Sequence, residues 1–183
     1  MKPKFIDYYM SIAKLTAQLS YAKRLQVGAV IVKGNQILSS GYNGMPSGWE
    51  NVCEYKVYNR FTSDDPHVDP STFQPITMDI LDQEYPFIDE SMITIKRYRL
   101  KTKPETLHAE RNALDKVAMS NESTAGAVMF TTHAPCLECA KSIYNTGITT
   151  VYYKEDYRSN DGIEFLKKTG VHVKKYSEPE ISV

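Results

Sequence analysis

The segment "AGAVMFTTHAPCLECAKSIYNTGITTVYY", residues 125–153, decides the fold because it holds a strand, a helix and a strand in succession. Its first ten residues, 125–134, are mostly apolar or β-branched and predict a strand. "CLECAKSIYNTG" at 136–147 predicts a helix that ends at Gly147, since glycine is common just past a helix C-terminus. "ITTVYYKE" at 148–155 predicts the second strand. This alternation is typical of an α/β fold.

The stretches on either side continue the alternation. Downstream, "GIEFLKKTG" at 162–170 predicts a helix ended by glycine, and "VHVKKY" at 171–176 predicts a last strand. Upstream, "HAERNALDKVAM" at 108–119 predicts another helix. Nearer the N-terminus, "VGAVIV" at 27–32 and "QILSSGYNG" at 36–44 predict a β-hairpin. Five strands are therefore expected in all.

The N-terminal segment 2–24 predicts an amphipathic helix, with Pro3 tolerated in its first turn. Its apolar residues recur at helical spacing and would form one face. They are Phe5, Tyr8, Ile12, Leu15 and Leu19. With helices available for both faces of the sheet, we expect a three-layer α/β/α fold around a central mixed five-stranded sheet.

The segment from about 46 to 106 breaks this order. It is rich in proline, acidic residues, tyrosine and phenylalanine and shows no sustained periodicity. Because a structureless stretch of this length is unusual in a compact domain, we interpret it as an irregular insertion with one or two short helices, at 77–83 and 89–100. The expected organisation is a single domain over residues 1–183 that carries this insertion.

Composition narrows the function. Lysine plus arginine and aspartate plus glutamate both number 22, so the net charge is zero, which argues against a nucleic-acid partner. No run of eighteen apolar residues predicts a membrane span, and the N-terminus lacks the pattern of a secretion signal. Three cysteines do not suggest a disulfide framework. We therefore expect a cytoplasmic protein with no membrane partner.

Four residues carry the candidate chemistry. Cys136 and Cys139 lie one turn apart at the start of a predicted helix, where the helix amides favour thiolates. His108 lies near the start of another helix, and an imidazole with two thiolates is a zinc-type ligand set that leaves one position for water. Glu110, two residues after the histidine, could exchange protons with that water.

Two other interpretations of these residues stay open. The Cys-x-x-Cys pair could be a buried or redox-active pair without a metal. Cys53 could complete a closed structural zinc site with His108, Cys136 and Cys139, although it lies far away in the irregular segment. Two halves of one pattern, "HAE" at 108–110 and "PCLEC" at 135–139, favour the catalytic interpretation.

In these two halves the chain resembles the zinc nucleobase deaminases, whose signature is H-x-E followed by P-C-x-x-C. Among them it is most similar to the deoxycytidylate (dCMP) deaminases. "VGAVIV" followed by "GYNGMPSG" at 41–48, a long insertion before "HAE", and the segment 125–153 all support this resemblance. The resemblance implies a cytidine deaminase-like fold and a single CMP/dCMP-type deaminase domain.

The resemblance also implies roles for individual residues. One zinc ion per chain would be held by His108, Cys136 and Cys139, and Glu110 would be the catalytic proton shuttle. The Ala109 amide would bond the cytosine 2-oxo group. The remaining candidates for contact with nucleotide are Asn43, Arg24, Tyr157 and Arg158. No second, structural zinc is expected, because the N-terminal helix lacks cysteine and residues 97–106 lack histidine.

The implied reaction is hydrolysis of dCMP to dUMP and ammonia, in which zinc-activated water attacks C4 and the product supplies thymidylate synthesis. The resemblance further implies a homo-oligomer, with a hexamer favoured, activation by dCTP, inhibition by dTTP, and Mg²⁺ accompanying the regulatory triphosphate. The alternatives are a deaminase of another nucleoside, nucleotide or tRNA base, and a zinc-stabilised binding module without activity.

Overall fold

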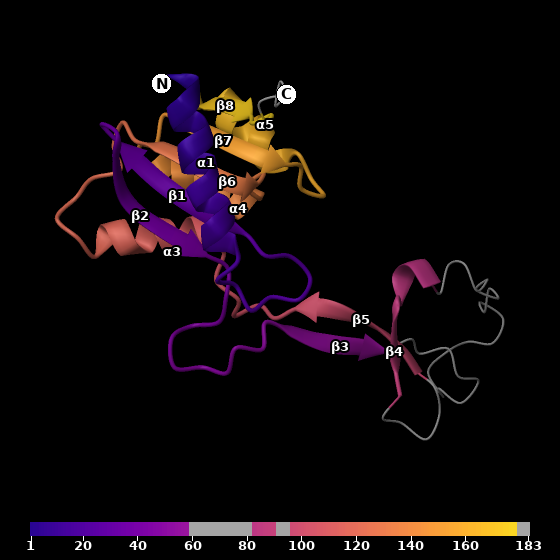
Figure 1. Ribbon diagram of the computed structural model, residues 1–183. Coiled ribbons are helices and arrows are strands. Elements are labelled where there is room, and N and C mark those ends of the chain that lie inside the picture. Colours follow the sequence, from indigo (N-terminus) through magenta and orange to yellow (C-terminus); the bar gives the residue numbers. More distant parts are fainter. Residues whose placement is uncertain (59–81, 91–95, 179–183) are drawn as a thin grey trace, which may run out of the picture. The chain divides into compact units, whose positions relative to one another are not determined.

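The computed structural model describes residues 1–58, 82–90 and 96–178 (Figure 1). The chain forms two compact units, one of Met1–Cys53 with Glu105–Val183 and the other of Glu54–Pro104. The second unit falls inside the segment that the sequence marks as an insertion. That both units act as a single domain stays a prediction.

The first unit is built on a five-stranded sheet in the order β2-β1-β6-β7-β8. β1 pairs antiparallel with both β2 and β6, whereas β6, β7 and β8 run parallel. The strands are β1 Gly28–Lys33, β2 Gln36–Tyr42, β6 Val128–His133, β7 Thr150–Glu155 and β8 His172–Lys175. The mixed five-stranded sheet expected from the sequence is confirmed.

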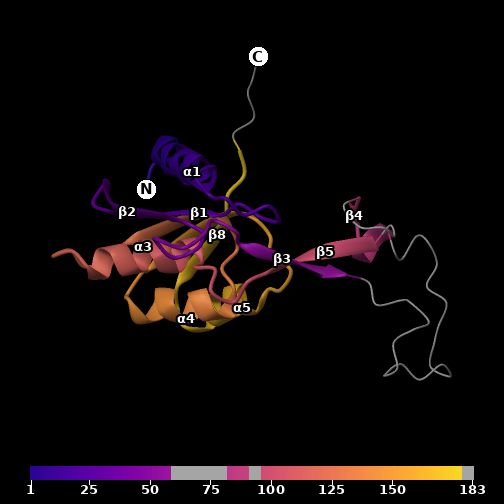
Figure 2. The same ribbon diagram turned by 90° about the horizontal axis from the view of Figure 1, so that it is seen from below.

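Helices cover both faces of this sheet (Figure 2). One face carries α1, and the other carries α3, α4 and α5. Their bounds are α1 Pro3–Ala17, α3 Ala109–Ala118, α4 Leu137–Asn145 and α5 Asp161–Lys168. Two apolar cores result, one centred on Phe130 and Met10 beneath α1 and one on Met129 and Ile143 beneath α3 and α4. Among the described residues, no helix combines the length and apolar character that a bilayer span requires.

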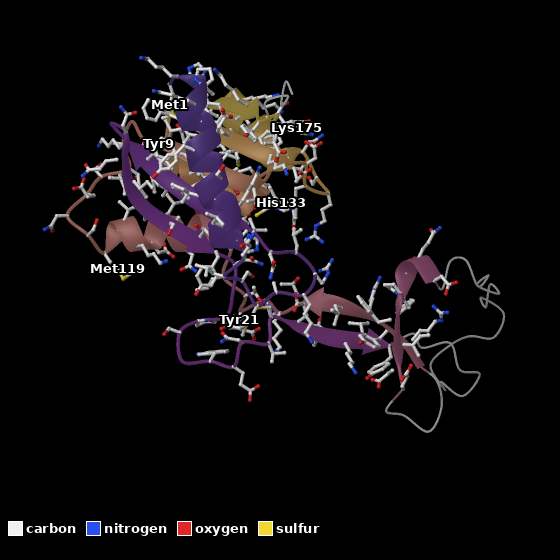
Figure 3. The ribbon with its side chains drawn as sticks, in the orientation of Figure 1. Met1, Tyr9, Tyr21, Met119, His133 and Lys175 are labelled. Atoms are coloured by element: carbon white, nitrogen blue, oxygen red, sulfur yellow. The ribbon has the colours of Figure 1, made fainter. Side chains whose placement is uncertain are left out.

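Two expectations about the N-terminal helix are wrong. The helix ends at Ala17 rather than near Arg24. The expected apolar face is wrong in part, since Tyr8, Leu15 and Leu19 are all more than half exposed. Its other two members, Phe5 and Ile12, are partly buried and pack against the core. The buried side is instead Tyr9, Met10, Ala13, Thr16 and Ala17, of which Tyr9 is labelled in Figure 3. The small residues lie inward because the β1 backbone at Gly28 comes close to Ala13 and Ala17.

The second unit contains a three-stranded antiparallel sheet in the order β3-β5-β4. Its strands are β3 Glu54–Tyr58, β4 Phe87–Asp89 and β5 Lys96–Thr102. The helix expected over 89–100 is therefore wrong for residues 96–100, because residues 96–102 alternate side chains and pair with a strand some forty residues earlier. Residues 91–95 of that expected helix lie outside the described residues. Of the helix expected over 77–83, only residues 82 and 83 lie within the described residues, and both are helical.

One buried carboxylate organises this small sheet. Asp89 accepts hydrogen bonds from Lys56 Nζ and the Tyr58 hydroxyl, each 2.6 Å long. The hydrogen bond to Asp89 raises the pKa of Lys56 and that of Tyr58. Tyr98 packs between Tyr58 and Phe87, at ring-centroid distances of 5.8 and 5.4 Å. Polar and aromatic contacts across strands therefore hold this unit together.

Candidate metal centre

Two helix N-termini place the three predicted ligands side by side. His108 is the N-cap residue of α3, Cys136 is the N-cap residue of α4, and Cys139 lies in the first turn of α4. Their ligand atoms all lie within 4.8 Å of one another. His108 Nδ1 is 3.3 Å from Cys139 Sγ and 3.5 Å from Cys136 Sγ. Among the described residues, this is the one such group of three or more metal-ligating side chains.

These distances fit a single zinc ion. Nitrogen and sulfur atoms bound to one tetrahedral zinc, at about 2.1 and 2.3 Å from it, are about 3.6 Å apart. The observed separations of 3.3 and 3.5 Å are close to that value. Imidazole and thiolates are also ligand types that zinc prefers. Cys136 and Cys139 are free cysteines, so both sulfurs can bind metal.

The pKa values of the two thiols are shifted in opposite directions. Hydrogen bonds that the Cys136 sulfur accepts from Cys139 and from His108 lower the pKa of Cys136 to about 3, so this residue is already a thiolate. The same neighbouring thiolate, together with burial, raises the pKa of Cys139. A cation between the sulfurs would remove this conflict, because both thiolates could then exist together. The donor set is therefore chemically suited to a divalent metal.

Glu110 lies against this ligand set and is shielded from water. Its side chain belongs to the first turn of α3 and is only 5 % exposed. Burial raises the pKa of Glu110 to about 7, while a hydrogen bond with Cys139 and the nearby His108 act in the opposite direction. A carboxyl group with a pKa near neutrality can both accept and donate a proton at neutral pH.

The segment leading into α3 is fixed to the end of β2. Gly44 and Leu107 exchange two backbone hydrogen bonds of 3.1 and 2.8 Å, one residue before His108. One turn into the helix, the Asn112 side-chain amide donates to the Tyr42 carbonyl at 3.0 Å. The N-terminus of α3 is thereby held at the edge of the sheet.

Arg111 links the two helices that carry the ligands. Its Nη1 donates to Ser142 Oγ on α4 at 2.9 Å, and its Nε pairs with Asp115 at 3.1 Å. No sequence pattern indicates this contact, because Arg111 and Ser142 are 31 residues apart and each resembles an ordinary surface residue. A hydrogen bond between two residues that are not ligands thus helps to hold α3 and α4 together.

Asn43 uses both ends of its side-chain amide inside the protein. Its Oδ1 accepts the Val27 amide at 2.7 Å, and its Nδ2 donates to the Leu25 carbonyl at 2.8 Å. Its own carbonyl accepts the Ser20 hydroxyl at 2.7 Å. These bonds hold the loop between α1 and β1, on which Arg24 lies. A nucleotide contact by Asn43 stays a prediction.

Replacing Asn43 with alanine should lower the free energy of unfolding by about 1–3 kcal/mol, because two backbone groups of the loop lose their partner. Chemical denaturation monitored by circular dichroism would measure the loss. Asn145→Ala, which changes an amide on α4 far from this loop, is the matched control and should cost less. Equal stability of Asn43→Ala and the parent protein would contradict the structural role.

The structure places the other predicted contact residues as follows. Ala109 is fully buried in the first turn of α3. Tyr157 and Arg158 precede α5, and the Arg158 guanidinium lies 5.2 Å from the centre of the Tyr157 ring. The hydrogen bond with Cys136 raises the pKa of His108, and the positive charge of Arg158 opposes that rise. Arg158 therefore lies close enough to the site to act on it electrostatically.

His133, which the sequence places near Cys136, ends β6 (Figure 3). Its Nδ1 lies 3.1 Å from the Thr132 hydroxyl, and burial lowers its pKa. The imidazole is therefore neutral at neutral pH. It does not belong to the three-residue ligand group.

Comparison with known proteins agrees with this geometry. The family described as "Cytidine and deoxycytidylate deaminase zinc-binding region" matches residues 3–155. The deoxycytidylate deaminase of Enterobacteria phage T4 is 32% identical over 171 residues, which cover 90% of this chain and 86% of the phage protein. ComE operon protein 2 of Bacillus subtilis is 29% identical over 97% of this chain and 74% of its own length.

A solved structure shares both sequence and fold. The dCMP deaminase of cyanophage S-TIM5, crystallised in complex with dCMP and dUMP, superposes with a TM-score of 0.69 at 36% identity. The match covers 96% of this chain and 99% of the cyanophage chain. The mixed sheet flanked by helices, the paired helix N-termini with their histidine and two cysteines, and the sequence match over residues 3–155 lead to one conclusion: this chain belongs to the cytidine and deoxycytidylate deaminase zinc-binding family.

Proposed function

We propose that this protein hydrolyses dCMP to dUMP and ammonia. The observation that carries the proposal is the buried Glu110 carboxyl beside a group of one histidine and two cysteines, in a chain of this family. A structural zinc site does not need a buried carboxyl group with a pKa near 7, whereas proton transfer at neutral pH does.

His108, Cys136 and Cys139 are the proposed zinc ligands. Zinc held by three protein ligands supplies a Lewis acid and lowers the pKa of a bound water to about 7. The three residues contribute before the metal arrives, because Cys136 is already ionised and His108 Nδ1 already faces both sulfurs. Little rearrangement is therefore needed to form the site.

Glu110 is the proposed proton carrier. Its carboxylate would take a proton from the water that attacks C4 and pass that proton to N3 of the cytosine ring. When the bond between C4 and the amino group breaks, a second proton reaches the departing nitrogen through the same carboxyl. The products are dUMP and ammonia, so water supplies both the new carbonyl oxygen and the protons. Exclusion of bulk water by burial keeps these transfers within the site.

Substrate recognition is assigned to the groups around the ligands. The Ala109 amide begins α3, so it has no acceptor within the helix and is the proposed donor to the 2-oxo group. Arg158 is the proposed partner of the 5′-phosphate, because its charge acts on His108. Tyr157, Arg24 and Asn43 remain further proposed contacts. A monophosphate needs only a small cationic pocket, which suits a chain of zero net charge.

Replacing Arg158 with alanine should raise the KM for dCMP by about tenfold or more, since a charge-assisted hydrogen bond is worth about 1.5–3 kcal/mol. The kcat should change little. Deoxycytidine, which lacks the phosphate, should show no comparable penalty, and steady-state kinetics with both substrates would measure the difference. An equal loss with dCMP and deoxycytidine would remove Arg158 from phosphate recognition. Lys168→Ala, on the distal end of α5, is the control.

Ammonia release from dCMP, CMP and deoxycytidine tests the proposed reaction directly. Metal-loaded protein should prefer dCMP, and inactivity on all cytosine nucleotides would refute the proposal. Activity confined to a tRNA base or another nucleobase would support the alternative deaminases instead. A non-enzymatic zinc module would require a fourth protein ligand, and among the described residues Cys53 is not a member of the ligand group.

Proposals on regulation and assembly rest on the family resemblance and not on contacts within the described residues. Activation by dCTP, inhibition by dTTP, Mg²⁺ bound with the triphosphate, a hexameric assembly and a cytoplasmic location rest on the family resemblance. Repeating the ammonia assay with each triphosphate, with and without Mg²⁺, tests the effectors. Sedimentation of the protein under the same conditions tests the assembly.

A further inference from the structure

Gly162, in the first turn of α5, lies against the backbone that carries Cys136. A Cβ atom at Gly162 would be 2.0 Å from the Pro135 carbonyl oxygen and 2.9 Å from the Cys136 carbonyl carbon and oxygen. All three neighbours are backbone atoms, so no side-chain rotation could relieve the overlap. Residue 162 is fully helical and buried, and glycine is a poor helix former, so the local conformation alone does not favour it.

Gly41, in β2, makes the corresponding contact with α3, the helix that follows His108. A Cβ atom there would be 2.4 Å from the Ala109 carbonyl oxygen and 2.5 Å from the Ala113 amide nitrogen. Ala109 lies between His108 and Glu110, so the contact fixes the turn of α3 that carries both. Glycine within a strand often marks such a close approach of two backbones.

We propose that Gly41 and Gly162 are positioning residues of the metal centre, which set the separation between His108 and the cysteine pair. Gly41 sets how closely α3 approaches β2, and Gly162 sets how closely α5 approaches the loop before α4. The segment that carries His108 and the segment that carries Cys136 are therefore each seated through a backbone contact with a glycine. This inference rests on the proposed zinc site.

The size of the overlap supports this role. Ordinary contact with a Cβ atom begins near 3.4 Å, so an added methyl group would push the facing backbones apart by roughly 1 Å at each position. Zinc sites hold their ligand distances to within about 0.2 Å. A displacement of this size exceeds that tolerance and would change the geometry of the bound metal.

Gly28 provides a matched control on the opposite face of the sheet. A Cβ atom there would be 2.1 Å from the Ala13 carbonyl oxygen and 2.5 Å from the Ala17 amide nitrogen, an overlap of the same kind and size. It would displace α1, which carries none of the ligands. Gly28→Ala therefore costs stability by the same steric mechanism without acting on the metal centre.

The experiment compares Gly41→Ala, Gly162→Ala and Gly28→Ala with the parent protein by titration with Co²⁺. The absorption bands of bound Co²⁺ report ligand geometry independently of activity. We expect Gly41→Ala and Gly162→Ala to lose about 10–100-fold in Co²⁺ affinity, the range typical of residues that orient metal ligands, and to show altered bands. Gly28→Ala should keep the parent affinity and spectrum while unfolding at lower denaturant concentration.

Stability is separated from positioning by measuring each variant's unfolding midpoint with and without Zn²⁺. The midpoint gain from Zn²⁺ reports binding, whatever the starting stability. Parent-like gains and spectra in Gly41→Ala and Gly162→Ala would overturn the inference, as would an equal disturbance in Gly28→Ala. If Gly162→Ala does not fold, Ile163→Val loosens the same turn of α5 without adding an atom, and an unchanged Co²⁺ affinity then overturns the role of that turn. A parent protein that binds no metal contradicts the proposed function itself.

Discussion

Replacing Glu110 with glutamine is expected to reduce turnover of dCMP by about 10²–10⁴-fold, the contribution typical of a positioned acid–base group. Glutamine has nearly the same shape, but its amide cannot accept and return a proton. The buried position of Glu110 means that no bulk water can easily replace it. Zinc content, measured by elemental analysis, should stay at one ion per chain, because Glu110 is not a proposed ligand. The kcat from ammonia release would give the reduction.

Glu164→Gln is the matched control for this experiment. Glu164 is an exposed acid on α5 that faces Lys168 at 3.9 Å, so the same chemical change should leave turnover unaltered. Near-normal kcat in Glu110→Gln would remove Glu110 from proton transfer. Loss of zinc in the same variant would instead assign the carboxyl to metal binding.

Replacing Cys139 with serine should abolish zinc binding and reduce turnover at least as far as the change at Glu110. Cys139 is buried and lies 3.3 Å from His108 Nδ1, so its sulfur cannot be replaced by another side chain without a rearrangement. A serine hydroxyl stays protonated at neutral pH and is a poor zinc ligand. Elemental analysis and the ammonia assay on the same sample would measure both losses.

Cys53→Ser separates a catalytic zinc from a closed structural one. Cys53 is as buried as Cys139 but lies outside the ligand group, so its replacement should leave one zinc per chain and nearly normal turnover. A closed four-ligand site would show the reverse, with zinc lost from Cys53→Ser. Retention of a full zinc complement by Cys139→Ser would contradict the assigned ligand set.

The five-stranded sheet and the group of one histidine and two cysteines could be predicted from sequence, because short stretches of neighbouring residues indicate them. β-branched runs such as 27–32 and the glycine at 147 mark strands and a helix end without reference to distant residues. The histidine and the two cysteines lie at the starts of predicted helices, so their convergence needed only the assumption that the helices are neighbours. The structure brings them within 4.8 Å of one another.

The errors arose where distant parts of the chain decide the outcome. The strand at residues 96–102 exists because it pairs with residues 54–58, and no window of sequence shows both at once. The outward face of α1 likewise depends on Gly28, which lies beyond the helix and admits only small side chains opposite it. The hydrogen bonds of the Asn43 amide to residues 16 and 18 positions earlier are likewise invisible in the sequence, whereas its nucleotide contact stays a prediction.

The paired backbone bonds between Gly44 and Leu107 have a consequence for evolution. They join the chain on both sides of the second unit, Glu54–Pro104, which lies between these two residues. Lengthening a loop whose ends are already joined costs little conformational entropy, since the cost grows only with the logarithm of length. Changes in the length of the second unit can therefore leave the positions of His108 and Glu110 unchanged.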